Sequence, residues 1–178
     1  MAELLIGCGD SRKRFVRGPN DPEGFLDLTT VDLDPNCGAD IEWNLERLPY
    51  EFAADNGFDE IHAYDVLEHT GQQGDWRFFF AQFSEFWRIL RPGGRLIGKS
   101  PALTSPWLWG DPGHKRVICK ENLSFLVQPE YDKQLGETAL CDYRHVYRAD
   151  FEMEHVEVSA RGNFIFALRA VKPSRITL

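Results

Sequence analysis

The sequence predicts an α/β fold of three layers, in which helices cover a mostly parallel sheet that closes in an antiparallel C-terminal hairpin. Short apolar runs bounded by turn residues recur through the first half of the chain and indicate buried strands. An amphipathic helix lies among them, and strands that alternate with helices favour parallel pairing. Two strand-like runs with a short turn between them end the chain, which favours an antiparallel pair.

Composition limits the class of protein. With 178 residues, of which 43% are hydrophobic, the chain can bury one core, and we expect a single domain over residues 1–178. A net charge of −8 disfavours nucleic acid as a partner. No apolar run approaches the roughly 20 residues of a membrane span, and the start MAELLIGCGD lacks the features of a signal peptide. Because the four cysteines are widely spaced, we expect reduced thiols, no metal and a cytoplasmic location.

The first strand is predicted over residues 4–6, and it enters a tight turn at Gly7-Cys8-Gly9-Asp10. Such glycines allow either a close approach of the backbone to a ligand or a structural turn that needs positive φ. The crossover that follows is rich in Arg, Lys, Gly and Pro. It predicts at most a short helix over 11–16 and then a loop through 18–22.

Three more strands are predicted before the amphipathic helix. The β-branched residues 29–31 lead into Asp32-Leu33-Asp34-Pro35, where proline ends the strand. A short strand is expected near 39–43. A buried strand over 59–64 leads into Asp65-Val66-Leu67-Glu68-His69, so polar residues again follow a strand end.

The amphipathic helix is predicted over residues 75–90, where apolar residues repeat at three- and four-residue spacing. Arg91-Pro92-Gly93-Gly94 is expected to end it. A fifth strand over 95–98 then leads into a Pro- and Trp-rich stretch, 101–112, that predicts an ordered loop.

The last third of the chain predicts one short helix and the closing hairpin. The helix is expected over 121–127. Strand-like runs over 155–160 and 163–171 are joined by Arg161-Gly162, which favours a tight turn.

Parallel sheets of this kind bind ligands at the carboxyl ends of their strands. Asp32 follows Gly9 by 23 residues and ends the second strand, a spacing at which a carboxylate can accept hydrogen bonds from ribose hydroxyls. Asp34 is the alternative ribose ligand, with Asp32 then a strand-end residue. The third glycine of a dinucleotide fingerprint is missing, because Arg12 stands in its place, and this disfavours a nicotinamide-dependent oxidoreductase.

Four segments together resemble the class I S-adenosylmethionine-dependent methyltransferases, particularly those with small-molecule acceptors. They are LLIGCGD, TTVDLDP, DEIHAYDVLEH and FWRILRPGGRLIG, and the resemblance runs from about Leu4 to Ser100. It implies a Rossmann-like domain with a cofactor-binding half over about 1–100 and acceptor-side loops over about 101–178.

The resemblance also implies which residues bind S-adenosylmethionine. The glycine turn would line the methionine and ribose part, and Asp32 with its neighbour would hold the ribose. The IEWNLERLP segment would meet the adenine, where the family often has an acidic residue and this chain has an amide. The full set is Gly7, Cys8, Gly9, Asp32, Leu33, Asn44, Leu45, Asp65 and Val66.

Two departures from the family pattern affect the expected site. The first strand begins without the N-terminal helices that often cover the cofactor, so we expect a site that is open or closed by a partner. The first crossover helix looks short and interrupted by proline, which makes cofactor binding weaker or dependent on formation of a homo-oligomer.

The candidate catalytic and acceptor-binding residues lie mainly in the second half. His114 is the preferred candidate base and His69 the second, although each also fits a structural role. Lys115 lies beside His114. Tyr143 and His145 are two apart and would face one side of a strand. Trp107 and Trp109 would either wall a substrate pocket or pin their loop to the core.

The acceptor class follows mainly from missing motifs. The segment after the fourth strand is not the Asn/Asp-Pro-Pro-aromatic motif that holds a flipped base, so nucleic acid is disfavoured. The expected function is methyl transfer to a small-molecule or glycan acceptor by in-line displacement. The alternative is a scaffold or partner-activating subunit that keeps the fold without turnover.

Overall fold

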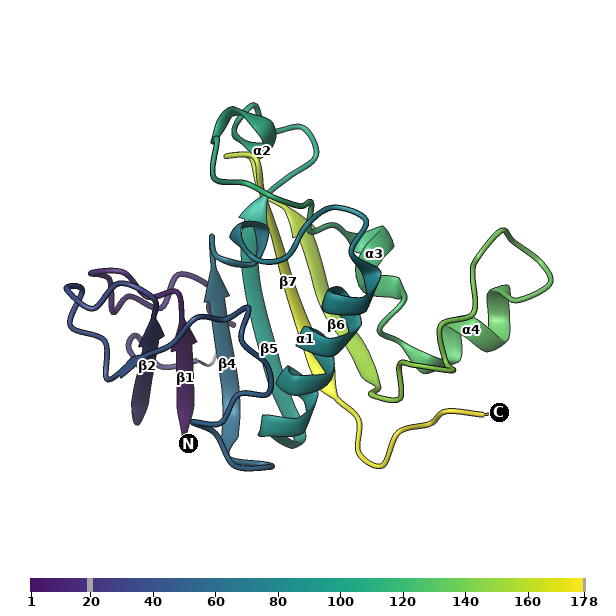
Figure 1. The fold of residues 1–178 in the computed structure, drawn as a ribbon, viewed down its shortest axis with the longest axis horizontal. Helices are drawn as coiled ribbons and strands as arrows, with labels where there is room; N and C mark the ends of the chain where they lie inside the picture. The colour runs from purple at the N-terminus through teal and green to yellow at the C-terminus, as the bar shows by residue number, and fades with distance from the viewer. Residues whose placement is uncertain (19–20, 178) are drawn as a thin grey trace.

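The computed structural model describes residues 1–18 and 21–177, and its strands form one seven-stranded sheet (Figure 1). The predicted loop over 18–22 includes Pro19 and Asn20, which lie outside the described residues. The strand order is β3-β2-β1-β4-β5-β7-β6. The strands are β1 (Glu3–Ile6), β2 (Leu28–Asp32), β3 (Ile41–Glu42), β4 (Phe58–Tyr64), β5 (Leu90–Pro101), β6 (Phe151–Val158) and β7 (Asn163–Ala170).

The pairing confirms a mostly parallel sheet with an antiparallel C-terminal hairpin. Strands β3, β2, β1, β4 and β5 pair in parallel, whereas β7 pairs antiparallel with both β5 and β6. The chain moves outward from β1 to β3 and then returns to build β4 and β5 on the other side. The order of the strands therefore reverses between β1 and β4, where an α/β sheet opens a crevice.

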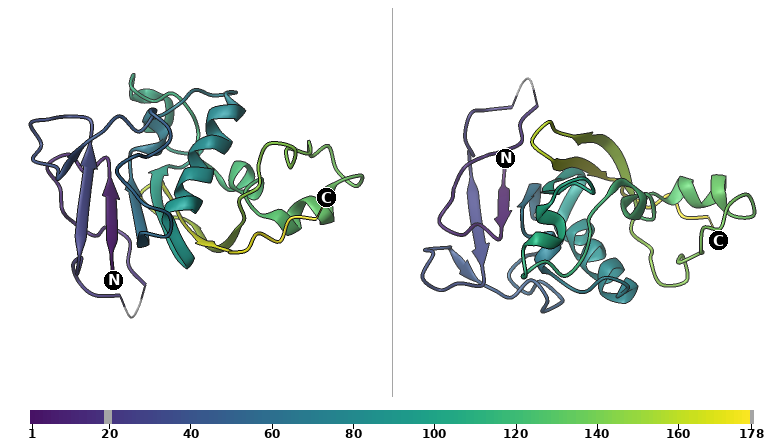
Figure 2. Two further views of the ribbon diagram at one scale, coloured as in Figure 1. Left: turned by 60° about the horizontal axis from the view of Figure 1, so that its bottom comes forward. Right: turned by 90° about the horizontal axis from the view of Figure 1, so that it is seen from above.

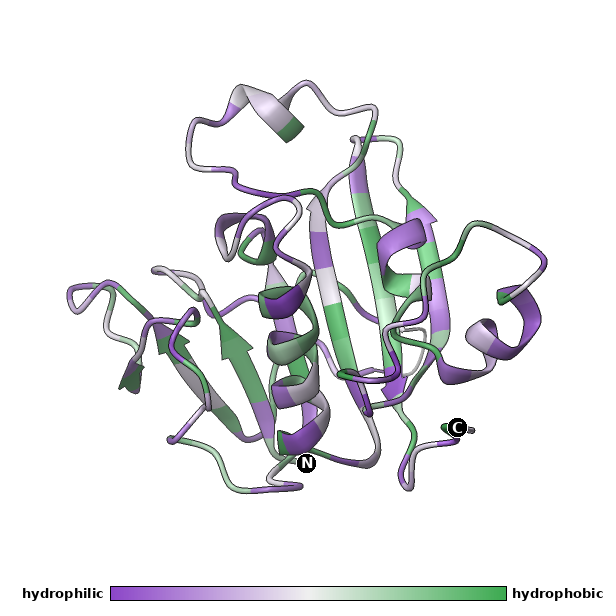
Figure 3. Cartoon of the chain, turned by 45° about the vertical axis from the view of Figure 1, so that its right-hand side comes forward, coloured by the Kyte–Doolittle hydropathy of each residue, from purple (hydrophilic) through white to green (hydrophobic). Residues whose placement is uncertain are grey.

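One face of the sheet is covered by α1 (Trp76–Ile89), as the periodicity predicts. Asp75 caps the helix, because its carboxylate accepts a hydrogen bond of 3.1 Å from the N–H of Phe78. Phe80, Phe83 and Phe86 point from α1 into the main core. Apolar residues concentrate in the strands, and the connections around them are mixed or polar (Figure 3).

The opposite face is covered by the connection from β1 to β2, which lies across the sheet from α1 (Figure 2). The helix predicted over 11–16 is wrong, since those residues are described and contain no helix. A smaller apolar cluster of Leu5, Cys8, Tyr64 and Ile97 lies on this face. The third layer is thus an irregular connection rather than a helix.

A buried ion-pair network explains why this connection is irregular. Glu3 on β1 and Glu60 on β4 are almost fully buried and both pair with Arg14, the second at 3.1 Å. His62 Nε2 lies 3.1 Å from Glu60 Oε2, and His62 Nδ1 lies 2.7 Å from the Tyr64 hydroxyl. A helix that covers this face would need an apolar stripe. The buried carboxylates instead favour an irregular connection that brings the side chain of Arg14 down to the sheet.

Several predicted boundaries move. The helix α1 ends at Ile89, before the Arg-Pro-Gly-Gly segment, because Leu90 is already extended and begins a β5 much longer than predicted. The stretch 101–112 contains a single helical turn, α2 (Trp107–Gly110). The short helix predicted over 121–127 is α3 (Lys120–Ser124), and a further short helix, α4 (Gln128–Gln134), follows it.

The segment around Tyr143 and His145 was expected to be a strand, and this is wrong. The structure places both residues in a turn before β6, where the N–H of Val146 bonds to the carbonyl of Tyr143 at 2.9 Å. The two-residue spacing of Tyr143 and His145 therefore does not indicate a strand of the sheet.

Candidate functional site

A cavity of about 340 Å³ opens at the carboxyl ends of β1, β2 and β4, where the order of the strands reverses. This volume is at the lower end of the range for small-molecule sites, about 300 Å³ and above. Of the residues predicted to bind the cofactor, the cavity is lined by Gly7, Gly9, Asp32, Leu33, Asn44, Leu45 and Val66. These residues are far apart in the sequence but lie close together, because the carboxyl ends of parallel strands meet at one edge of the sheet.

The glycine turn forms the floor of this cavity. Gly7 has φ +61°, and a Cβ there would lie 2.2 Å from Val66 Cγ2, so no other residue fits without a shift of backbone or side chain. Gly9 has φ +47° but open space around it. Both readings of the turn therefore apply: Gly7 is required for packing, and Gly9 leaves room beside the cavity.

Asp32 is held by the turn that it faces. Its Oδ2 accepts a hydrogen bond of 2.7 Å from the N–H of Gly9, and its Oδ1 accepts one of 2.9 Å from the N–H of Asp34. A carboxylate has about four acceptor positions, so two stay available to a ligand. Asp34 does not line the cavity, because its Oδ1 turns away to bond the backbone and side chain of Asn36.

The segment after β3 forms the side wall. Asn44 Oδ1 accepts a hydrogen bond of 2.9 Å from the N–H of Glu46, which fixes the amide in a turn. Leu45 is buried and offers an apolar surface. Trp43, which the sequence reasoning did not select, also lines the cavity, with its indole N–H bonded to the carbonyl of Arg47 at 3.0 Å. An aromatic and an aliphatic side chain beside an amide suit a planar heterocycle.

Two predicted cofactor residues lie off the cavity wall. Cys8 is buried among the smaller apolar cluster, and burial raises the pKa of its thiol to about 11. Asp65 has φ +50°, and its carboxylate forms an ion pair with Lys99. Neither residue is therefore among those that line the cavity.

The rim opposite Asp32 is tied together by one carboxylate. Glu46 Oε1 accepts hydrogen bonds from Lys115 Nζ at 2.8 Å and from the N–H of Gly71 at 2.9 Å. The bond from Lys115 holds the pKa of Glu46 below its usual value. Lys115, which is predicted to contact the acceptor, thus lines the cavity. Its charge is neutralised by Glu46, which was not predicted from the sequence.

The two histidines predicted as bases lie against each other at this rim. Their ring centroids are 4.6 Å apart, with the rings nearly perpendicular. His69 lines the cavity. The side chain of His114 is only 6% exposed and does not line the cavity. His69 Nδ1 is 3.1 Å from the carbonyl oxygen of Gly113, and His114 Nδ1 is 3.0 Å from that of Leu108.

A buried arginine fixes the loops that carry these histidines. Arg116 donates from Nε to the carbonyl of Leu67 at 2.9 Å and from Nη2 to Thr70 Oγ1 at 2.9 Å, and it also bonds Gln82 of α1. Burial lowers its pKa to about 10, so the side chain is still a cation at neutral pH. The loop after β4 and the loop after α2 are consequently held together as one unit.

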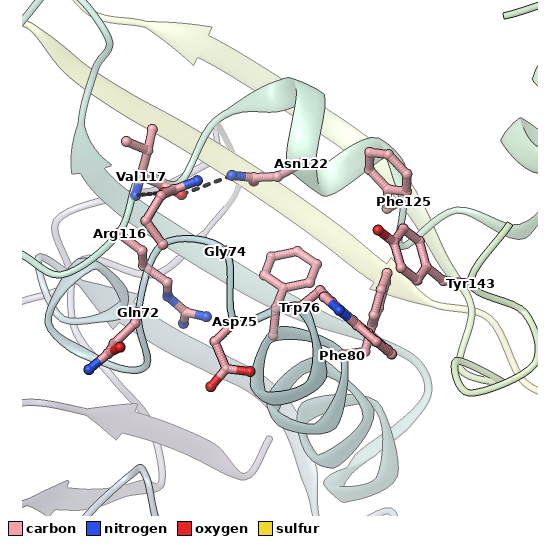
Figure 4. A pocket seen from close by; sticks show the side chains of 12 residues that line it. Gln72, Gly74, Asp75, Trp76, Phe80, Arg116, Val117, Asn122, Phe125 and Tyr143 are labelled. Carbon is pink, nitrogen blue, oxygen red and sulfur yellow. Dashed lines mark hydrogen bonds between the residues drawn. The ribbon is translucent and has the colours of Figure 1, made fainter. Parts of the chain in front are cut away.

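A second cavity of about 180 Å³ lies beyond this unit, at the start of α1 (Figure 4). Its wall is aromatic: Trp76, Phe80 and Tyr143 point into it, with the rings of Trp76 and Tyr143 centred 5.2 Å apart. His145 is exposed and lines neither cavity. Tyr143 therefore belongs to a pocket separate from the one that contains His69 and Lys115.

Neither alternative for the tryptophans of the 101–112 loop describes what is found. Trp107 and Trp109 are 67% and 60% exposed and line neither of these cavities, and Leu108 between them is the buried residue of α2.

No helix among the described residues is long and apolar enough to cross a membrane.

The residues missed by sequence reasoning are Trp43, Glu46 and Thr70, each of which lines the cavity. Trp43 and Glu46 flank the predicted pair Asn44 and Leu45, so their position in the same turn was the available signal. Thr70 carries no such signal. It reaches the wall because the chain after β4 coils into a 3-10 turn, Leu67–His69, instead of entering α1 directly.

No model of a protein family and no curated protein matches the sequence, but solved structures match the fold. A S-adenosylmethionine-dependent methyltransferase from Archaeoglobus fulgidus is 16% identical, with a TM-score of 0.54 over 96% of this chain and 86% of that chain. The 1,6-didemethyltoxoflavin-N1-methyltransferase of Burkholderia thailandensis, solved with 1,6-didemethyltoxoflavin and S-adenosylhomocysteine, is 14% identical, with a TM-score of 0.55 over 96% and 72% of the two chains.

A third match is to the complex between the Haloferax volcanii Trm112 methyltransferase activator and a methyltransferase. It is 9% identical, with a TM-score of 0.53 over 96% of this chain and 82% of that chain. At such identities the likeness concerns the fold. The chain has the Rossmann-like α/β fold of class I S-adenosylmethionine-dependent methyltransferases.

Proposed function

We propose that this protein binds S-adenosylmethionine in the cavity at the carboxyl ends of β1, β2 and β4 and transfers its methyl group to a small-molecule or glycan acceptor. The observation that carries the proposal is the pairing of Asp32 with the glycine turn, where the carboxylate bonds the N–H of Gly9 at 2.7 Å and keeps free acceptor positions. This arrangement suits the two hydroxyls of a ribose.

The lining of the cavity supports an orientation for the cofactor. The ribose would lie at Asp32 and Leu33, and the adenine would lie against Trp43, Asn44 and Leu45. The methionine part would then cross the glycine turn toward Val66. The methyl group would point to the rim that carries His69 and Lys115.

Methyl transfer from a sulfonium needs positioning above all. A lone pair of the acceptor attacks the methyl carbon from the side opposite sulfur, the new bond to carbon forms, and the C–S electron pair returns to sulfur to give neutral S-adenosylhomocysteine. If the acceptor atom carries a proton, that proton leaves to a base or to solvent. No covalent intermediate on the protein is required.

The structure disfavours a dinucleotide at the same turn. Dinucleotide folds place the pyrophosphate at the N-terminus of the helix that follows the first strand. Here residues 7–18 contain no helix. Arg12, in place of the third glycine, donates to the carbonyls of Gly9 and Gly38, each at 2.8 Å. Its guanidinium is thereby engaged in closing the turn.

The open rim supports a small acceptor or the end of a glycan chain. The neighbour from Burkholderia thailandensis was solved with bound 1,6-didemethyltoxoflavin and S-adenosylhomocysteine, and it has the same fold. A cytoplasmic location and self-association stay predictions of the sequence.

One observation favours the alternative of a partner-dependent or non-catalytic subunit. A matching structure contains a methyltransferase together with an activator protein. In this chain the layer over β1 and β4 is an irregular connection rather than a helix. A second protein could bind over this layer.

The test is conversion of labelled S-adenosylmethionine to S-adenosylhomocysteine by purified protein, with a panel of hydroxylated and amine-bearing metabolites and oligosaccharides as acceptors. We expect at least one acceptor to raise turnover above the acceptor-free rate, and Asp32→Ala to reduce this increase at limiting S-adenosylmethionine because it binds the cofactor more weakly. Cofactor binding without turnover across the panel would favour the partner-dependent alternative.

A further inference from the structure

We propose that Glu68, His69 and His114 form a binding site for a divalent transition-metal ion at the rim of the cavity. One ring nitrogen from each histidine and one carboxylate oxygen of Glu68 lie within 4.8 Å of one another. The residues come from two loops, the turn after β4 and the loop after α2, that Arg116 holds together. The sequence gives no sign of this set, because 45 residues separate the two histidines.

The hydrogen bonds of the histidines prepare them as ligands. A carbonyl oxygen can only accept, so Nδ1 of His69 donates to Gly113 and Nδ1 of His114 donates to Leu108. In the neutral tautomer that carries the proton on Nδ1, the lone pair lies on Nε2. Fixing of the ring by a bond from Nδ1–H to a backbone carbonyl is the usual outer-shell arrangement of metal-binding histidines.

Glu68 supplies the second, independent observation. Its side chain has no solvent exposure, and Oε2 accepts a hydrogen bond of 3.0 Å from Ser100 Oγ. Oε1 has no hydrogen-bond partner among the described residues. A buried carboxylate without a partner is costly, and a bound cation removes that cost.

Two other groups of metal-type side chains are already occupied by the protein itself. In the group of Glu3, Glu60 and His62, both carboxylates pair with Arg14, which takes the place of a metal cation. In the group of Cys8, Asp32 and Cys37, Asp32 bonds the backbone, and burial keeps Cys8 as a thiol by raising its pKa to about 11. Among the described residues, the cluster at Glu68 is the group whose unpartnered carboxylate oxygen is not paired with an arginine.

The ligand set indicates the class of metal. Two imidazoles and one carboxylate favour a first-row divalent ion such as Zn²⁺ over Mg²⁺ or Ca²⁺, which prefer oxygen. Ligand bonds of about 2.1 Å allow ligand atoms to lie at most about 4.2 Å apart, so the cluster contracts slightly on binding. Asp111 Oδ2 lies 3.8 Å from His114 Nε2 but does not belong to the group, so further coordination positions are left to ligands from outside the cluster.

The site would give the rim a chemical preference, and this consequence rests on the proposed function. His69 lines the cavity, so a coordination position left open beside it faces the space where the methyl group would lie. A metal ion there binds an oxygen of the acceptor and lowers the pKa of a hydroxyl. Hydroxyl acceptors are therefore preferred over amines.

The test is a Co²⁺ titration of the full chain after metal removal by a chelator, followed by visible absorption and calorimetry. We expect one Co²⁺ per chain, with the ligand-field bands of a nitrogen and oxygen site. His69→Ala and His114→Ala should each weaken binding by at least about 100-fold. His145→Ala is the matched control: its Nδ1 also bonds a backbone carbonyl, at 3.2 Å, but it lies outside the cluster, and binding should be unchanged.

The variants must remain folded, which far-ultraviolet circular dichroism checks. If His114→Ala unfolds, His114→Gln keeps a donor for the Leu108 carbonyl without the imidazole lone pair, and it should weaken binding as much. Absence of Co²⁺ binding by the native chain, binding unchanged in both histidine variants, or thiolate-to-cobalt charge transfer would each overturn the proposal.

The metal proposal and the proposed function fail separately, because the titration contains no S-adenosylmethionine. A chain that binds S-adenosylhomocysteine but no Co²⁺ contradicts only the metal site. A chain that binds Co²⁺ through the two histidines but no S-adenosylhomocysteine supports the metal site and contradicts the cofactor.

Discussion

At the scale of single residues, Asp32 distinguishes a nucleoside site from a structural turn. Replacement of Asp32 by Ala removes the acceptor that the ribose would use, and hydrogen bonds to a charged group contribute roughly 1.5–3 kcal/mol. We therefore expect Asp32→Ala to weaken S-adenosylhomocysteine binding by about 10- to 100-fold. Calorimetric titration of the variant measures this directly.

Asp34→Ala is the matched control, since Asp34 carries the same group two residues away but lies outside the cavity. Its affinity should stay close to that of the native chain. If the control loses affinity and Asp32→Ala retains it, the ribose role belongs to Asp34.

Gly7 and Gly9 test whether the turn is required for packing or for ligand approach. Both have positive φ, so alanine at either position carries a backbone cost of roughly 1–2 kcal/mol. Only at Gly7 does a Cβ also meet Val66, which adds roughly 1–3 kcal/mol for overpacking. Urea unfolding should show Gly7→Ala to be the more destabilising variant, and equal losses in the two variants would contradict this account of the turn.

The sequence could predict Asp32 but could not separate it from Asp34. Both follow an apolar strand, and the choice depends on β2 ending at Asp32, after which Asp34 turns toward Asn36. The pairing of His69 with His114 was equally hidden, since it arises from loops that meet through Arg116.

At the scale of elements, α1 and the strands were predictable because each has a periodic pattern of its own. Phe80, Phe83 and Phe86 repeat at helical spacing and are all buried. The crossover after β1 was not predictable. Its conformation depends on Arg14 meeting Glu3 and Glu60, partners that are distant in sequence and adjacent only once β1 and β4 have paired.

That network makes the stability of the fold sensitive to acid. Burial opposes ionisation of Glu60, but the hydrogen bonds from His62 and Arg95 outweigh it and lower its pKa from 4.5 to about 2. A lowered pKa in the folded state stabilises the fold above the unfolded value, and this stabilisation is lost as pH falls from about 4.5 toward 2. The contribution is on the order of 3 kcal/mol.

We expect the free energy of unfolding to fall across this pH window in the native chain. Glu60→Gln should flatten the dependence, although it lowers stability at neutral pH. Glu23→Gln serves as the control, because Glu23 is exposed and should leave the slope unchanged. Urea unfolding at several pH values provides the measurement, and identical slopes in the native and Glu60→Gln chains would rule out the network as the cause.

At the scale of the whole molecule, the parallel sheet and its closing hairpin could be predicted from the alternation of segments. The cavity at the carboxyl ends of β1, β2 and β4 could also be predicted, because the carboxyl ends of parallel strands meet at one edge. The positions of Tyr143 and His145 could not. Tyr143 and His145 looked like neighbours on a strand, yet one lines an aromatic pocket near α1 and the other is exposed. Loops without a repeating pattern carry no such geometric rule.

The proposed binding of S-adenosylmethionine in the cavity at the switch point of the sheet can be measured by calorimetric titration. The purified chain is titrated with S-adenosylhomocysteine, with NADH and ATP as controls. We expect one S-adenosylhomocysteine to bind per chain at about micromolar affinity, with no comparable binding of the controls. No binding, or NADH binding as tight as that of S-adenosylhomocysteine, would contradict it.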